Sequence, residues 1–173
     1  MKTGARFVFS ACALLALGAC GDTAGERGSR VPGEDCAPSA DGSVVVLDGW
    51  LRAQPNADAM TAAYFNLRNC TDKPLTITGV STAAAGRAEI HQTSRDANGL
   101  VSMAPAGDIP VNPGETVVFE PGGLHAMLMM LTGPINPDDQ TTLTVELGEE
   151  KSVTFNATAK SAADAANTGH DSH

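Results

Sequence analysis

Two histidines and two methionines stand at fixed distances along this sequence, in the pattern H-x11-M-x21-H-x-M. Thioether sulfur prefers Cu(I), imidazole accepts several transition metals, and hard ions such as Mg²⁺ or Ca²⁺ prefer oxygen ligands. No thiolate or carboxylate belongs to the pattern, so the side chains predict a copper site that favours Cu(I). The four residues are His91, Met103, His125 and Met127.

The same residues also admit an ordinary structural interpretation. Methionine fills irregular gaps in protein cores, and residues 124–131 (LHAMLMML) have the composition of a buried strand. The four side chains would then be scattered over a metal-free β-sandwich that serves as an interaction module on the cell envelope. A copper-dependent enzyme is a third alternative, but two thioether ligands argue against a redox-stable Cu(II) site. We therefore expect no enzymatic activity.

Whether the copper ligands can meet depends on one loop. His125 and Met127 are two residues apart, which puts both side chains on one face of a strand. His91 and Met103 flank residues 94–99, which we expect to turn back as a hairpin. A two-residue turn at 98–99 would put these two side chains on opposite faces, whereas an odd-numbered loop, or a bulge at Gly99, would put them on the same face. The copper hypothesis therefore predicts an odd-numbered loop near residues 97–99.

Short β-type runs separated by turn residues fill the middle of the chain. Gly, Pro, Asn and Asp cluster between the runs, and no segment shows a sustained helical period. This pattern predicts an all-β fold, an antiparallel barrel or sandwich, in a single domain over residues 44–156. The expected strands are Ser43–Leu47, Thr61–Arg68, Leu75–Ser81, Ala88–Thr93, Leu100–Met103, Thr116–Phe119, His125–Leu131, Thr141–Leu147 and Lys151–Asn156.

The first 19 residues resemble a secretory signal of the lipoprotein type. Lys2 and Arg6 precede a short apolar run, and Leu-Gly-Ala-Cys follows it, ending at Cys20. The run is too short to span a bilayer as a helix, which needs about 20 apolar residues. We expect cleavage before Cys20, lipid attachment to it, and anchoring on the extracytoplasmic, periplasmic face of a bacterial membrane. Residues 20–43, rich in Gly, Ser, Ala and Pro, then serve as the lipid anchor and flexible tether.

Two cysteines remain once the signal and the lipid-bearing residue are set aside. Cys36 and Cys70 would be joined outside the cytoplasm, where disulfides persist. The sequence has no C-x-x-C pair, which argues against a thiol–disulfide oxidoreductase.

The formal charge moves from −9 to −11 when the signal is removed, because the signal holds two basic residues and no acidic one. This acidic balance argues against nucleic-acid binding. Residues 157–173 read as a disordered tail, and its two histidines, His170 and His173, form a candidate secondary site for Cu(II).

The four-residue pattern resembles the PCu(A)C family of exported copper chaperones, whose fingerprint is H-M-x10-M-x21-H-x-M. The full spacing matches, and so do Glu89-Ile90 before the first ligand and Pro121-Gly122-Gly123-Leu124 before the third. Gln92 departs from the fingerprint, which usually has Met directly after the first His. An adjacent strand residue faces the other way, so this departure leaves the four-ligand pattern intact.

The resemblance implies a cupredoxin-like fold with a surface-exposed Cu(I) site. It also implies a carrier that delivers copper to a cuproprotein, notably for assembly of the copper centre of cytochrome c oxidase. The expected partners are a copper-accepting protein such as cytochrome c oxidase subunit II, or a Sco-type chaperone, and a membrane reached through the lipid anchor.

Overall fold

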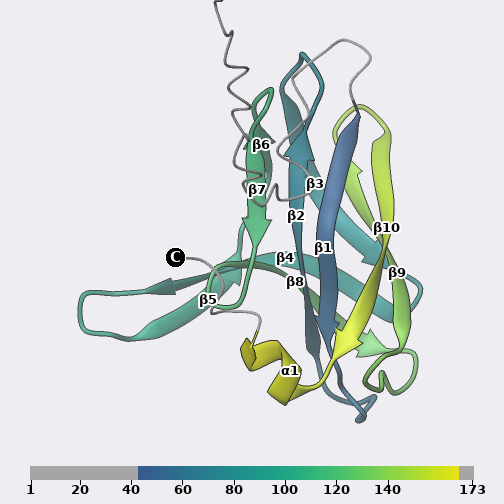
Figure 1. Cartoon of the computed structure of the whole chain (residues 1–173). Coiled ribbons are helices and arrows are strands. Elements are labelled where there is room, and N and C mark those ends of the chain that lie inside the picture. Colours follow the sequence, from purple (N-terminus) through teal and green to yellow (C-terminus); the bar gives the residue numbers. More distant parts are fainter. Residues whose placement is uncertain (1–42, 168–173) are drawn as a thin grey trace, which may run out of the picture. The chain divides into compact units, whose positions relative to one another are not determined.

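The computed structural model describes residues 43–167, which form ten strands and one short helix (Figure 1). No helix within this described range is long and apolar enough to span a membrane. The elements are β1 (Val44–Arg52), β2 (Thr61–Asn69), β3 (Leu75–Thr82), β4 (Ala85–Arg95), β5 (Val101–Pro105), β6 (Ile109–Val111), β7 (Thr116–Phe119), β8 (Leu124–Leu131), β9 (Gln140–Leu147), β10 (Lys151–Lys160) and α1 (Ala162–Asn167).

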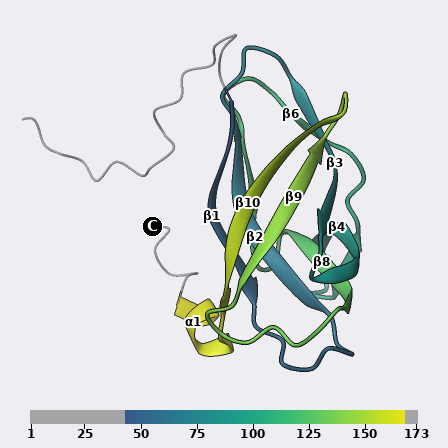
Figure 2. The same cartoon turned by 90° about the vertical axis from the view of Figure 1, so that its right-hand side faces the viewer.

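The ten strands join in one sheet with the order β5-β4-β8-β7-β2-β1-β10-β9-β3-β6. Most neighbours are antiparallel, while β1–β10 and β7–β8 are parallel pairs that the sequence did not indicate. β3 also contacts β4, its neighbour in sequence, so the sheet curls round and closes over its inner face (Figure 2). The predicted all-β, cupredoxin-like fold is confirmed.

The core forms where the inward residues of alternating strands meet. In β9, Leu143, Val145 and Leu147 are buried while their neighbours are more exposed, as the alternation of a strand requires. Phe65 of β2 is 1% exposed and lies at the centre, with its ring centroid 4.1 Å from that of Phe119 and 5.0 Å from that of Phe155. These contacts fix β2 against β7 and β10.

β2 is buried on both of its faces, because a second, smaller apolar cluster covers its outer side. Ala62 and Tyr64 point away from the core and pack with Trp50 of β1, whose ring centroid is 4.4 Å from that of Tyr64. Ala165 of α1 packs against this cluster, and the Lys160 ammonium lies 5.2 Å from the centroid of the Trp50 ring. We call Trp50, Ala62 and Tyr64 the aromatic floor, because the candidate metal ligands lie beside it.

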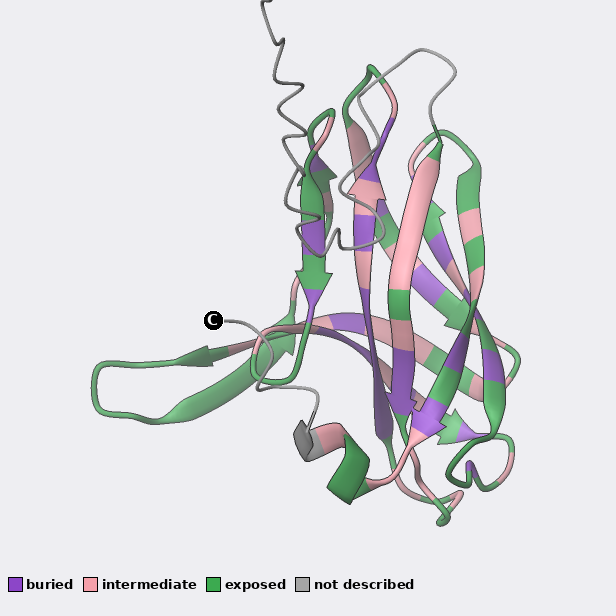
Figure 3. Ribbon diagram, viewed as in Figure 1, coloured by how far each residue is buried: buried purple, intermediate pink, exposed green. Residues whose placement is uncertain are grey.

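The β4–β5 hairpin projects away from the rest of the sheet (Figure 1). Every residue of β5 is exposed, in contrast to the buried residues of β2 (Figure 3).

The end of the domain lies later than predicted. Residues 157–160 continue β10, and α1 follows, where the sequence had suggested that a disordered tail begins at 157. The reason is that Ala157 and Ala159 are fully buried small residues pointing inward, whereas in the sequence this alanine-rich run looked like a low-complexity tail. Ser161 caps α1, since its hydroxyl accepts from the backbone N–H of Asp164 at 3.2 Å.

Candidate metal centre

Pairing of β4 with β8 sets the two histidines opposite each other. His91 is the cross-strand partner of His125, and Glu89 is the partner of Met127. Along β8, Ala126 and Leu128 are buried in the core, so His125 and Met127 project from the opposite face. The two imidazole ring centroids are 6.0 Å apart.

The β4–β5 loop has the odd length that brings Met103 to the same face. Arg95 pairs with Val101, which leaves five residues between them, and Thr93 pairs with Met103. Thr93 is two residues from His91, so His91 and Met103 share a face. The predicted loop parity is confirmed.

The turn that produces this parity is built on Asp96. Its backbone carbonyl accepts from the N–H of Gly99 at 3.0 Å, and its Oδ1 accepts from the backbone N–H groups of Asn98 and Leu100. Gly99 has φ +83°, a left-handed conformation that glycine adopts without a steric cost.

His125 is held in one orientation with one nitrogen directed at sulfur. Its Nδ1 lies 3.1 Å from the carbonyl oxygen of Gly123, and its Nε2 lies 3.2 Å from Sδ of Met103. A carbonyl only accepts, so Nδ1 carries the proton, and in the neutral ring Nε2 presents a bare lone pair. Two lone-pair donors, nitrogen and thioether sulfur, therefore face one another, as two ligands of a single soft cation would.

His91 is oriented by a carboxylate. Glu89 accepts from Nε2 of His91 at 3.2 Å and also binds the guanidinium of Arg87. The hydrogen bonds from Arg87 and then from His91 hold the pKa of Glu89 below its ordinary value, so the carboxylate stays charged. Because a carboxylate accepts the Nε2 proton, neutral His91 keeps its lone pair on Nδ1. Metal-bound histidines commonly donate their second nitrogen in this way.

The strand register places Met127 on the same face as the other three residues. It lies beside Glu89 of β4 and Ala62 of β2, and it is half-buried. Met129 is the next residue on the same face and is also half-buried. Met60 precedes β2 and is 58% exposed. The structure thus brings three predicted ligands into contact and places the fourth on their face.

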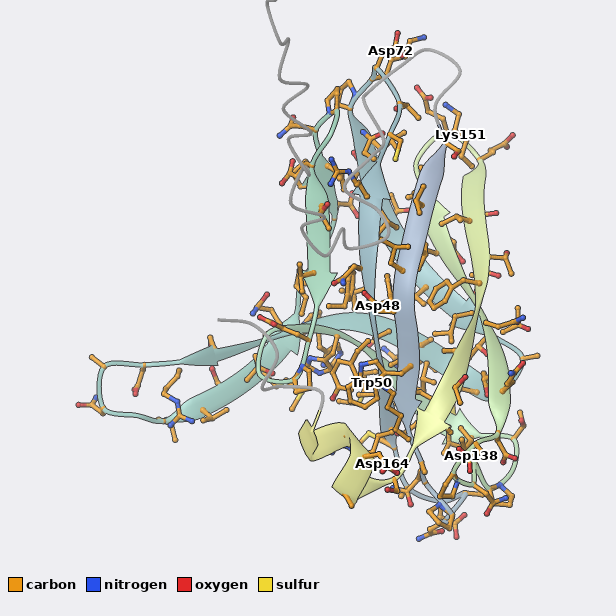
Figure 4. All side chains as sticks on the ribbon, in the orientation of Figure 1. Asp48, Trp50, Asp72, Asp138, Lys151 and Asp164 are labelled. Carbon is orange, nitrogen blue, oxygen red and sulfur yellow. The ribbon has the colours of Figure 1, made fainter. Side chains whose placement is uncertain are left out.

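The four side chains differ in how open they are to solvent. His125 is 5% exposed and His91 is half-buried, whereas Met103 is 53% exposed. The aromatic floor forms the inner side of the candidate metal site. The Tyr64 ring centroid lies 6.5 Å from that of His125. Burial raises the pKa of Tyr64, which keeps its phenol neutral. Figure 4 shows Trp50 toward the end of the domain that carries Asp164 of α1, with Asp72 and Lys151 at the opposite end.

Sequence reasoning missed Trp50, Tyr64 and Glu89 as parts of the site. Glu89 stands two residues before His91, the spacing of a shared strand face, so that carboxylate was findable. The aromatic floor was not, since it needs β1, β2 and α1 to come together.

Other donor sets are less suitable in the part of the chain that the structure describes. Residues 43–167 bring no three His, Cys, Asp or Glu side chains together around one point, so a metal site here needs the thioethers. Cys70 is buried and disulfide-bonded, and a disulfide sulfur offers no thiolate. Cys20, Cys36, His170 and His173 lie outside the described residues, so the lipid anchor, the Cys36–Cys70 pairing and the second copper site stay predictions.

Comparison with known proteins decides the family. The family model described as "Putative lipoprotein LpqE-like" matches residues 44–159, most of the chain. The chain belongs to the LpqE-like family. Its resemblance to PCu(A)C proteins is confirmed by the solved structures that share its fold.

Among these structures, the copper-bound PCuAC domain from PmoF2 is 24% identical with a TM-score of 0.56, covering 69% of this chain and 94% of that domain. The solution structure of Cu(I)-bound DR1885 from Deinococcus radiodurans is 26% identical with a TM-score of 0.52, covering 70% and 81%. A protein of Leifsonia xyli subsp. xyli named "Putative lipoprotein Lxx21020" is 29% identical over 122 residues, covering 70% of this chain and 69% of that protein. The LpqE-like chain is thus similar both to named lipoproteins and to copper-bound domains.

Proposed function

We propose that this LpqE-like protein is a carrier of Cu(I) whose ligands are His91, Met103, His125 and Met127. The observation that carries the proposal is the 3.2 Å approach of Nε2 of His125 to Sδ of Met103, while Nδ1 of the same ring bonds to the Gly123 carbonyl. Two lone pairs at this distance repel unless a cation or a proton lies between them. A soft cation such as Cu(I) matches both donors.

The ligands suit a carrier because they differ in solvent exposure and in how firmly neighbouring groups hold them. His125 is buried and fixed by the Gly123 carbonyl, so it holds the metal in place. Met103 is more than half exposed, so an incoming ligand can replace its sulfur without unfolding the domain. Copper can then pass to an acceptor by ligand exchange, with no change of oxidation state and no acid, base or nucleophile. This chemistry describes a chaperone and not an enzyme.

The proposed setting of the carrier is supported by its relatives and by the signal segment predicted for residues 1–19. Similarity to a protein named as a lipoprotein supports export and anchoring through Cys20 on the extracytoplasmic face of the membrane. The Cu(I)-bound and copper-bound domains that share the fold support copper as the cargo. The recipient in this proposal is a cuproprotein such as cytochrome c oxidase subunit II, with a Sco-type chaperone as the alternative partner. His170 and His173 would add a secondary Cu(II) site.

The proposal is tested by anaerobic competition for Cu(I) against a chromophoric chelator, using wild type and His125→Ala. We expect one tightly held Cu(I) per chain in wild type and its loss in the variant. Copper should also raise the melting temperature of wild type, because a ligand that binds the folded state stabilises it. Failure of the wild-type chain to compete for Cu(I) would contradict the proposal and leave a metal-free interaction module.

A further inference from the structure

The exposed strand β5 is an open edge of the sheet that carries a proposed copper ligand. Within residues 43–167, β4 is its one strand neighbour, and β5 stands at the end of the strand order. Open edges pair readily with other chains, and natural proteins usually protect them with charges, prolines or short length. The opposite edge is protected in this way, because β6 has three residues with Pro110 in the middle. β5 is longer and holds no charged residue (VSMAP).

The backbone hydrogen bonds of the β4–β5 hairpin determine which backbone groups of β5 are free. The backbone carbonyl of Leu100 accepts from the N–H of Asp96, and the N–H of Ala106 donates to the carbonyl of Ile90 at 2.9 Å. Even-numbered residues between 100 and 106 therefore bond toward β4. Strand geometry alternates, and the N–H and C=O groups of Val101 and Met103 therefore point away from β4, toward the open side. Pro105 has no N–H, which ends the available edge.

Met103 links this edge to the metal centre. Its backbone faces outward, while its sulfur lies 3.2 Å from Nε2 of His125 on the face of the proposed ligands. The aromatic floor and the buried His125 close the inner side, so the exposed side of the site is the β5 side. Leu100 and Val101 beside it are also exposed, at 68% and 49%.

We propose that the copper acceptor docks by adding an extended strand to β5, with a cysteine thiol opposite Met103. This inference rests on the proposed function. A residue paired with Met103 would have its Cβ about 5 Å away, with its side chain on the same face. Its thiol loses a proton to solvent, its sulfur bonds to Cu(I), and the Met103 thioether leaves; the copper stays Cu(I). Backbone pairing thus brings the thiolate of the acceptor, which is the stronger copper ligand, next to Met103, the most exposed of the four proposed ligands.

The test uses the full chain loaded with one Cu(I) under anaerobic conditions. The probe is a capped nine-residue peptide of alternating Thr and Val with Cys at its centre, and a Ser peptide serves as its counterpart. On adding either peptide, amide hydrogen exchange at Val101 and Met103 should slow. Only the Cys peptide should remove copper. Unchanged exchange at both amides would overturn the proposal.

A proline pair tests the edge without touching a ligand. Val101→Pro removes an outward N–H and leaves the bonds to β4 in place. Ala97→Pro is the matched control, because residue 97 is the second residue of the Asp96–Gly99 turn, where proline is favoured. We expect copper transfer to the Cys peptide to slow about tenfold in Val101→Pro, because the variant loses one or two hydrogen bonds to the peptide. Transfer should be unchanged in Ala97→Pro.

The outcomes separate this inference from the proposed function. Both variants should keep wild-type affinity for Cu(I), since the four ligands are intact. If Val101→Pro binds Cu(I) normally and transfers it at the wild-type rate, strand addition is wrong while the carrier stands. If wild type does not bind Cu(I), the proposed function itself fails. Self-association of the chain that Val101→Pro abolishes would assign the edge to a second copy and overturn the proposal.

Discussion

Replacing Met103 by leucine should separate copper binding from folding. Leucine has a similar volume but lacks the sulfur, so Met103→Leu removes a ligand and little else. Met103 is 53% exposed, and surface substitutions of this kind change stability by at most about 0.5 kcal/mol. We therefore expect the apo variant to unfold at nearly the wild-type denaturant concentration.

The effect on copper should be much larger. Losing a group that only orients a metal ligand typically costs about 10–100-fold in affinity. Sδ of Met103 directly faces the His125 lone pair, so its loss should reach at least the upper end of that range. A factor of about 100 corresponds to about 2.7 kcal/mol of binding free energy.

The assay is anaerobic competition for Cu(I), run beside chemical denaturation of the apo protein. Met130→Leu is the matched control, because Met130 is also exposed, at 65%, and undergoes the same chemical change. The control should bind copper as wild type does. Met103 is not a copper ligand if Met103→Leu and Met130→Leu bind Cu(I) within a factor of about three of each other.

Three further changes test other parts of the account. Met127→Ala should weaken Cu(I) binding, and equal affinities for variant and wild type in a competition titration would remove it from the ligand set. Glu89→Gln should weaken Cu(I) binding by about 10–100-fold by releasing His91. Because the folded pKa of Glu89 is lowered, its carboxylate stabilises the fold above pH 4.5, and that contribution is lost as pH falls through the folded pKa. When the free energy of unfolding is measured at falling pH, Glu89→Gln should lack this part of the wild-type decrease. Phe65→Ala should cost about 3–5 kcal/mol in urea unfolding, and a loss below about 1 kcal/mol would contradict its central place in the core.

Much of the site was predictable because strands have a simple period. The two-residue step from His125 to Met127 fixes a shared face whatever the rest of the fold does. The odd-numbered loop followed from requiring His91 and Met103 to meet, and the Asp96–Gly99 turn supplies it. The remaining condition, that β4 pairs with β8, depends on long-range contacts that spacing alone does not reveal.

The parts that could not be predicted depend on tertiary context. Trp50 and Tyr64 form the floor beside His125 only because β1 pairs with β2 and α1 covers them. Ala157 and Ala159 look like tail residues until the curled sheet buries them. β6 was missed since three residues around Pro110 give too short a pattern to detect. For the aromatic floor and the two alanines, the deciding partner lies far away in the sequence.

X-ray absorption of the Cu(I)-loaded chain tests the central claim most directly, because it reports which atoms bind the metal. We predict nitrogen and sulfur scatterers together around a single Cu(I), with part of the sulfur shell lost in Met103→Leu and nitrogen lost in His125→Ala. A copper environment without sulfur, or one that neither substitution changes, would contradict the assignment of these residues as the ligands.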